Sequence, residues 1–206
     1  MRISKTKEKI MKYLLTITLA LTSLTVAQDE LPGWGVYLGG GLGSVSMEDA
    51  EGVTIGFEPA LPFIGVTKGV MLGVPLVVSA GIGKRAYNLE MDFMGVTMKT
   101  GASFNYIDIA AYMPYPVGPG FAQVGFLLGN PLNTGTMTLD IDGETESEDM
   151  KDLDMDPDYG LVLAYGYPVN EKINVNAGYY LGLADHGEEG SSMKFNGLFL
   201  FLGYNF

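Results

Sequence analysis

The sequence predicts an all-β protein, an eight-stranded antiparallel transmembrane β-barrel. Three observations predict it: eight segments in which apolar residues alternate with small or polar ones, long and short connections in strict order, and a composition rich in glycine and poor in charge. The 206 residues include 29 glycines, and only 17% are charged, against about 25% in an average soluble domain. One barrel domain accounts for this length.

The strand prediction rests on a period of two, because a strand points successive side chains to opposite faces. The last segment shows it most clearly, with Leu198, Leu200 and Leu202 on one face and glycine or phenylalanine between them. Each segment approaches the roughly 9–11 residues that a transmembrane strand needs, although alternation is weak in 61–72. The other segments are 34–46, 76–87, 101–113, 120–129, 159–167 and 172–184.

The connections support the same fold. Residues 73–75, 114–119 and 168–171 are short, whereas the connections between them are long and mostly polar: 47–60, 88–100, 130–158 and 185–196. Outer-membrane barrels alternate short periplasmic turns with longer external loops. In lipid every backbone N–H and C=O must be paired, so an even number of antiparallel strands closes on itself and leaves no edge.

Residues 1–27 are predicted to be a cleaved signal peptide, and 28–206 the barrel domain. Five basic residues precede the apolar segment 13–26, and polar residues follow Ala27. The long basic region leaves Met11 as an alternative start to Met1. The other interpretation, a transmembrane anchor, needs about 20 apolar residues, more than this segment supplies.

Charge and cysteine content exclude several function classes. The net charge is −12, and the predicted leader holds five of the 12 basic residues, so the mature chain is more acidic still. Nucleic acid is therefore excluded as an expected partner, because phosphate binding needs a basic face. The chain has no cysteine, which excludes disulfides, thiol catalysis and a lipid-anchored cysteine.

At this point the chain resembles a known group. The leader, the strands rich in glycine and aromatic residues, and the last segment Gly-Leu-Phe-Leu-Phe-Leu-Gly-Tyr-Asn-Phe (197–206) are similar to small outer-membrane β-barrel proteins of the PorT-like or OmpX-like kind. The resemblance implies a bacterial outer-membrane location, lipid as the surroundings, and the barrel-assembly machinery as a partner. It also implies that this machinery reads an assembly signal formed by Phe206, Tyr204, Leu202 and Leu200.

Residues 140–158 are the most acidic part of the sequence, with ten acidic residues and one base, Lys151. Asp152, Asp154 and Asp156 have the spacing that opens a calcium-binding loop, which makes divalent cations a possible partner. Pro157 stands where such a loop has glycine, and no glutamate occupies its twelfth position. The alternative is a solvated acidic loop without a bound metal.

Two further sets of residues invite a chemical interpretation. Arg85 and Asp108 fall on the inward faces of neighbouring predicted strands, where a buried charge requires a partner, so we expect a lumen ion pair. His186 is the single histidine and lies in a predicted external loop near Ser191 and Ser192. A catalytic histidine needs a hydroxyl within hydrogen-bond reach and a third group to orient it, which local sequence does not show.

The function predicted from the sequence is a structural or surface-interaction role, with acidic loops outside and neither enzyme activity nor a cofactor. The inward rows are more apolar than those of a water-filled channel, which indicates either a lumen packed by side chains or a site that binds or transports a small lipophilic ligand. A lipid A-modifying enzyme using His186 is a further alternative. A soluble periplasmic barrel is disfavoured, because the outward rows carry no charge.

Overall fold

The structure is a computed structural model that describes residues 33–48, 52–93, 95–187 and 191–206. The predicted leader, residues 1–27, lies outside this part. No helix in the described residues is long and apolar enough to cross a membrane. The described residues form ten strands: β1 (Trp34–Met47), β2 (Val53–Gly56), β3 (Glu58–Met71), β4 (Pro75–Phe93), β5 (Val96–Val117), β6 (Gly120–Ile141), β7 (Glu144–Met150), β8 (Asp158–Pro168), β9 (Ile173–Gly182) and β10 (Met193–Asn205).

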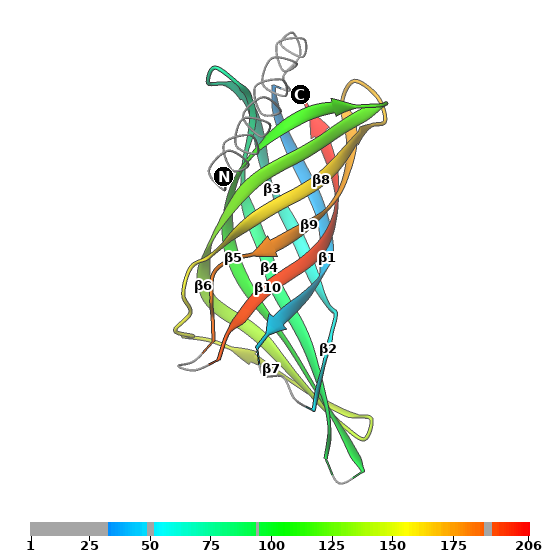
Figure 1. Cartoon of the computed structure of the whole chain (residues 1–206), viewed down its shortest axis with the longest axis vertical. Helices are drawn as coiled ribbons and strands as arrows, with labels where there is room; N and C mark the ends of the chain where they lie inside the picture. The colour runs from blue at the N-terminus through cyan, green and yellow to red at the C-terminus, as the bar shows by residue number, and fades with distance from the viewer. Residues whose placement is uncertain (1–32, 49–51, 94, 188–190) are drawn as a thin grey trace, which may run out of the picture.

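Eight of these strands make a closed antiparallel ring in the order β1-β3-β4-β5-β6-β8-β9-β10 (Figure 1). The ring closes where β10 pairs with β1, from Gly35 opposite Asn205 to Met47 opposite Met193. The predicted eight-stranded barrel is confirmed. Closure gives every strand of the ring two hydrogen-bonded neighbours, which a sheet in lipid requires.

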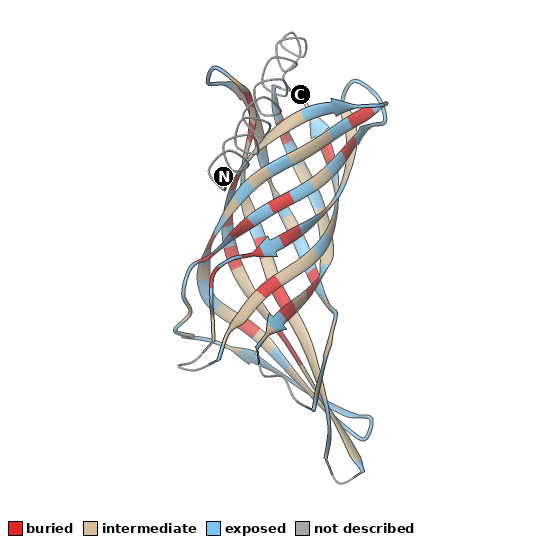
Figure 2. Cartoon of the chain, in the orientation of Figure 1, coloured by how far each residue is buried: buried red, intermediate tan, exposed pale blue. Residues whose placement is uncertain are grey.

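The outer surface of the ring is apolar, as the alternation predicts. Leu198, Leu200 and Leu202 on β10 are 48%, 57% and 55% exposed, and Leu38 on β1 is 57% exposed. Figure 2 shows exposed residues alternating with more buried ones along the strands. Such a row is unfavourable in water and favourable against lipid acyl chains.

The weak alternation in 61–72 has a structural cause. The pairing register between β1 and β3 shifts by one residue between Gly39 and Gly41 of β1. Leu61 and Ile64 of β3 are both exposed although they are three residues apart. A bulge of this kind moves the outward row from odd to even positions, so a period of two read along the sequence is interrupted there.

Inward glycines let aromatic rings lie across neighbouring strands. The ring of Tyr37 on β1 lies over Gly65 of β3 and Gly81 of β4, and a Cβ added to Gly65 would stand 2.5 Å from the Tyr37 hydroxyl. A narrow eight-stranded barrel has little room for side chains. Glycine at these positions leaves space for one large ring to span three strands.

The predicted long connections are wrong in part, because strands continue into them. β4 extends to Phe93, β6 extends to Ile141, and residues expected in loops form β2 and β7. The pairings β2–β4, β4–β5, β5–β6 and β6–β7 make a sheet that projects beyond the ring at the lower end of Figure 1. Outside lipid both faces of a strand meet water, so these segments lack the apolar alternation by which the other strands are recognised.

Candidate functional site

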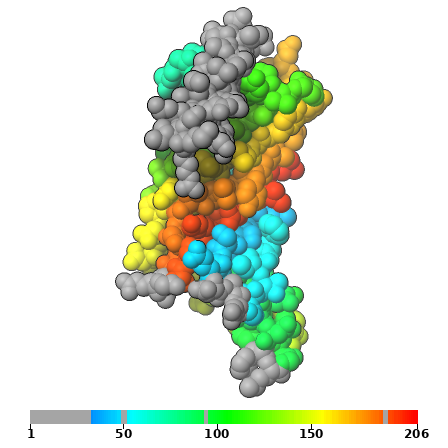
Figure 3. All heavy atoms as spheres, in the orientation of Figure 1, coloured from blue at the N-terminus to red at the C-terminus, as the bar shows by residue number. Residues whose placement is uncertain are grey.

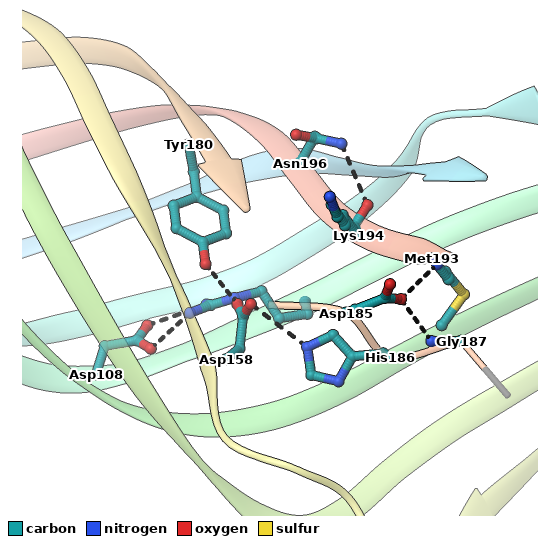
Figure 4. Close-up of polar contacts among 10 residues, drawn as sticks. Asp108, Asp158, Tyr180, Asp185, His186, Gly187, Met193, Lys194 and Asn196 are labelled. Carbon is teal, nitrogen blue, oxygen red and sulfur yellow. Dashed lines mark hydrogen bonds and ion pairs between the residues drawn. The ribbon is translucent and has the colours of Figure 1, made fainter. Parts of the chain in front are cut away.

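The polar centre of the barrel is a buried ion cluster around Arg85 of β4. Its Nη2 and Nη1 atoms lie 2.9 and 3.2 Å from the two carboxylate oxygens of Asp108 on β5, and its Nε lies 2.5 Å from Asp158 on β8. Tyr180 of β9 donates a hydrogen bond of 2.7 Å to the same oxygen of Asp158, as Figure 4 shows. Asp158 is fully buried, and the arginine and Asp108 are 6% and 8% exposed. Four strands therefore meet in one charged network.

Two tyrosine rings hold the guanidinium group between them. The Arg85 Cζ atom lies 4.9 Å from the ring centroid of Tyr106 and 4.8 Å from that of Tyr180. Arginine at this distance from an aromatic face is stabilised by a cation–π interaction. The hydroxyl of Tyr106 is buried and has no hydrogen-bond partner among the described residues. The two tyrosines thus add cation–π contacts to the ion pairs that hold the guanidinium group.

His186 joins this cluster from the connection between β9 and β10. Its Nε2 lies 3.4 Å from Asp158 Oδ1, and its ring packs 4.8 Å from that of Phe195. His186 lies in a connection between strands, as predicted, but its side chain is only 6% exposed and turns inward. The imidazole faces a carboxylate, and the Ser192 hydroxyl hydrogen-bonds to Asp185 instead. Within these contacts the histidine is a member of the ion cluster that also packs against an aromatic ring.

Apolar side chains fill the lumen on the long-loop side of the ion cluster. The rings of Tyr87, Phe104 and Phe195 lie 6.1 to 6.3 Å from one another. Phe195 is 1% exposed and packs in a cluster with the buried Val45 and Val162. Together with the ion cluster, these side chains close the lumen toward the external loops.

The other half of the lumen is hollow. A cavity of about 570 Å³ extends from Arg85 and Asp108 to the short-turn end, where its lining includes Pro168, Asn170 and Glu171. The lumen is thus packed with side chains in one half and hollow in the other, and the binding of a lipophilic ligand stays a prediction. Volumes of about 300–1,000 Å³ are typical of sites that bind small molecules.

The remaining predicted site residues have separate positions. Asp152, Asp154 and Asp156 are exposed in the segment between β7 and β8. Within the described residues, no group of three or more acidic, histidine or cysteine side chains is arranged to hold a metal ion. Tyr204 and Phe206 lie on the outer side of the ring next to β1, together with Leu200 and Leu202. Their role as an assembly signal stays a prediction.

Outside the membrane, two charged groups have shifted pKa values. The pKa of Asp185 is lowered because its carboxylate accepts hydrogen bonds from the backbone N–H groups of Gly187 and Met193, 3.0 and 2.9 Å away. The pKa of Lys99 on the projecting part of β5 is raised by its hydrogen bond and ion pair with Glu90 of β4, at 3.0 Å. The first pair of contacts joins Asp185 to Gly187 and to the start of β10, and the second joins two projecting strands.

A closed antiparallel ring with an apolar outer surface and a partly filled lumen defines a transmembrane β-barrel. Residues 15–206 match the family model of the outer membrane protein beta-barrel domain, so the chain belongs to this family, and it is a bacterial outer-membrane protein. The expected family and location are thereby confirmed.

The chain is similar in fold to several solved structures. It shares 13% identity with Neisserial surface protein A, covering 84% of this chain and 97% of that one, with a TM-score of 0.48. With Ail, the attachment invasion locus protein of Yersinia pestis, it shares 12% identity, covering 85% of this chain and 100% of that one, with a TM-score of 0.46. With the outer membrane protein OprG of Pseudomonas aeruginosa it shares 15% identity, covering 87% of this chain and 98% of that one, with a TM-score of 0.37. No curated protein matches the chain.

Proposed function

We propose that this outer-membrane barrel serves in surface interaction and that the projecting sheet formed by β2, β7 and the outer parts of β4, β5 and β6 is its contact element. One observation carries the proposal: the sheet continues well beyond the ring, with β5 and β6 each 22 residues long. About 9–11 residues suffice to cross a membrane. Figure 3 shows the β4–β5 hairpin as part of a narrow extension at the lower end of the molecule.

The charge of the edge strand β7 indicates the chemistry of a partner. Glu144, Glu146 and Glu148 are exposed and, two residues apart, share one face of the strand. The opposite face is anchored to β6, since Thr145 and Thr136 hydrogen-bond to Asp140 and Asp149 at 2.8 and 3.3 Å. Among the described residues β7 pairs with β6 alone, so its other edge has no strand partner. An ordered acidic edge fits a basic surface better than a mobile loop does, because its charges are already in place.

The test measures binding of the barrel in lipid nanodiscs to a polylysine-coated sensor. In the test variant, Glu144→Gln, Glu146→Gln and Glu148→Gln are combined, which removes three charges and keeps the side-chain size. An exposed ion pair contributes about 0.2–1 kcal/mol, so three of them change the affinity about 3- to 150-fold. The matched control combines Asp152→Asn, Asp154→Asn and Asp156→Asn, which removes three charges from the neighbouring segment outside the sheet.

The expected result is a clear loss of affinity in the glutamate variant and a smaller loss in the aspartate variant. Equal losses in both would show that net charge alone governs binding and would contradict a role for the sheet. Heat-modifiable migration on a gel is the control that tests whether both variants form the barrel.

A further inference from the structure

The lumen cavity has two ends of different character. Toward the external loops it stops at Arg85 and Asp108, behind which lie the buried Asp158, Phe195 and Val45. Toward the periplasmic side its lining continues to the turn residues Asn170 and Glu171. A molecule entering from the periplasm therefore meets a dead end, and the shape is that of a binding pocket rather than a conducting pore.

The deep part of the cavity is aromatic. Phe199 and Phe201 of β10 stack with ring centroids 4.7 Å apart. Phe63 of β3 meets Phe201 edge-on at 5.6 Å, and Tyr37 of β1 meets it at 5.3 Å. All four line the cavity. Rings held in this way offer an apolar wall with fixed geometry to a flat or branched apolar group.

Primary amides gather between these rings and the short-turn end. Gln123 of β6 donates a hydrogen bond of 3.2 Å to Asn176 of β9, which donates one of 2.5 Å to Asn174. These three side chains line the cavity together with Asn205 of β10. A primary amide has two N–H donors and a carbonyl with two lone pairs, so this group has donors and acceptors beyond the bonds it makes to itself.

The charges that line the cavity balance one another. Arg85 and Asp108 pair with each other in the lumen, Lys84 belongs to the outward row of β4 because it alternates with Arg85, and Glu171 is exposed in the turn between β8 and β9. A charged ligand would lose its hydration in this cavity without meeting a free opposite charge of matching geometry. The lining thus favours an uncharged ligand.

We propose that the cavity binds an uncharged amphiphile that enters from the periplasmic side, with its apolar body against the rings of Phe63, Phe199 and Phe201 and its polar head against the amides of Gln123, Asn174 and Asn176. The volume of about 570 Å³ fits a molecule of drug-like size. This site is separate from the projecting sheet, so its test is independent of the proposed surface function.

The experiment uses the absence of cysteine in the chain, which makes any introduced thiol unique. Ser79 of β4 lines the cavity, and Ala80 next to it is exposed on the opposite face of the strand. The Ser79→Cys and Ala80→Cys variants, in lipid nanodiscs, are allowed to react with N-ethylmaleimide with and without the uncharged probe phenylnaphthylamine. Thr67→Cys on β3, which pairs with position 79 and also lines the cavity, is a second lumen variant if Ser79→Cys does not fold.

At a probe concentration of about ten times its dissociation constant, the lumen thiol should react about tenfold more slowly, because only the empty fraction is accessible. The reaction rate of the lipid-facing thiol of Ala80→Cys should change by less than about twofold. This variant therefore controls for the effect of probe dissolved in the lipid. The sulfonated analogue anilinonaphthalene sulfonate should protect far less. Equal effects on both thiols would overturn the binding site, and equal protection by the sulfonate would overturn the preference for an uncharged ligand.

Discussion

Replacing the central cation of the ion cluster is the most direct test of how the lumen is stabilised. In Arg85→Met the side chain stays long and apolar but loses its charge, so Asp108 and Asp158 lose a partner that lies 2.9 and 2.5 Å from them. Two buried carboxylates then lack the guanidinium group, and Asp158 keeps only Tyr180 and His186 as partners. Removing one partner of a buried ion pair costs about 3–5 kcal/mol, a large share of the stability of an ordinary domain.

Two matched variants separate charge from geometry. Arg85→Lys keeps the charge but cannot donate to both carboxylates in the same fork, so we expect a smaller loss of about 1–3 kcal/mol, typical of one hydrogen bond to a charged group. Combining Arg85→Met with Asp108→Asn and Asp158→Asn removes all three charges. This triple variant should recover most of the stability, because no uncompensated charge remains.

The measurement is equilibrium unfolding by urea in lipid bilayers, followed by heat-modifiable migration on gels. The urea concentration at the unfolding midpoint should be highest for the wild type, lower for the triple variant and Arg85→Lys, and lowest for Arg85→Met. A loss below about 1 kcal/mol for Arg85→Met would refute the reasoning, because surface ion pairs already contribute that much. Failure of the triple variant to improve on Arg85→Met would show that packing, rather than uncompensated charge, causes the loss.

Three further predictions concern packing, assembly and pH. Gly65→Val places side-chain atoms against the Tyr37 ring and should destabilise the barrel by about 1–3 kcal/mol in the same urea assay; an unchanged midpoint would contradict that contact. Deletion of Phe206 should slow assembly into the outer membrane, measured as the fraction of heat-modifiable barrel in cells, whereas equal assembly would exclude it from the signal. Because the pKa of Asp185 is lowered in the folded protein, its contribution to the stability of the fold is complete above the usual aspartate pKa. This contribution is lost as the pH falls through the lowered pKa. The protection of the Met193 amide against hydrogen exchange, relative to the intrinsic rate at the same pH, should therefore fall at acid pH in the wild type, and Asp185→Asn should remove this pH dependence.

The ring strands could be predicted from the sequence because lipid imposes its demand locally. Each outward position of a membrane strand must be apolar, so Leu198, Leu200 and Leu202 reveal their face without knowledge of their neighbours. The projecting strands lack that demand. Glu144–Met150 forms a strand because it pairs with β6, and such pairing leaves little trace in a polar sequence.

The ion cluster was predictable in part. The inward positions of Arg85 and Asp108 follow from alternation, and the structure places the two side chains together. Asp158 was assigned to the acidic loop, although it continues the inward row of Gly160 and Val162, which is the signal that could have placed it in the barrel. His186 had no such signal, because a loop side chain can turn to either side.

By itself, the sequence determined the number of strands in the ring, their inward and outward faces, and the order of long and short connections. These follow from a period of two and from the apolar surroundings, both of which act on residues near one another in the chain. Only the tertiary structure decided which inward residues meet at the same depth. Contact between Arg85, Asp158 and His186 joins positions up to 101 residues apart, and it depends on the register of every strand between them.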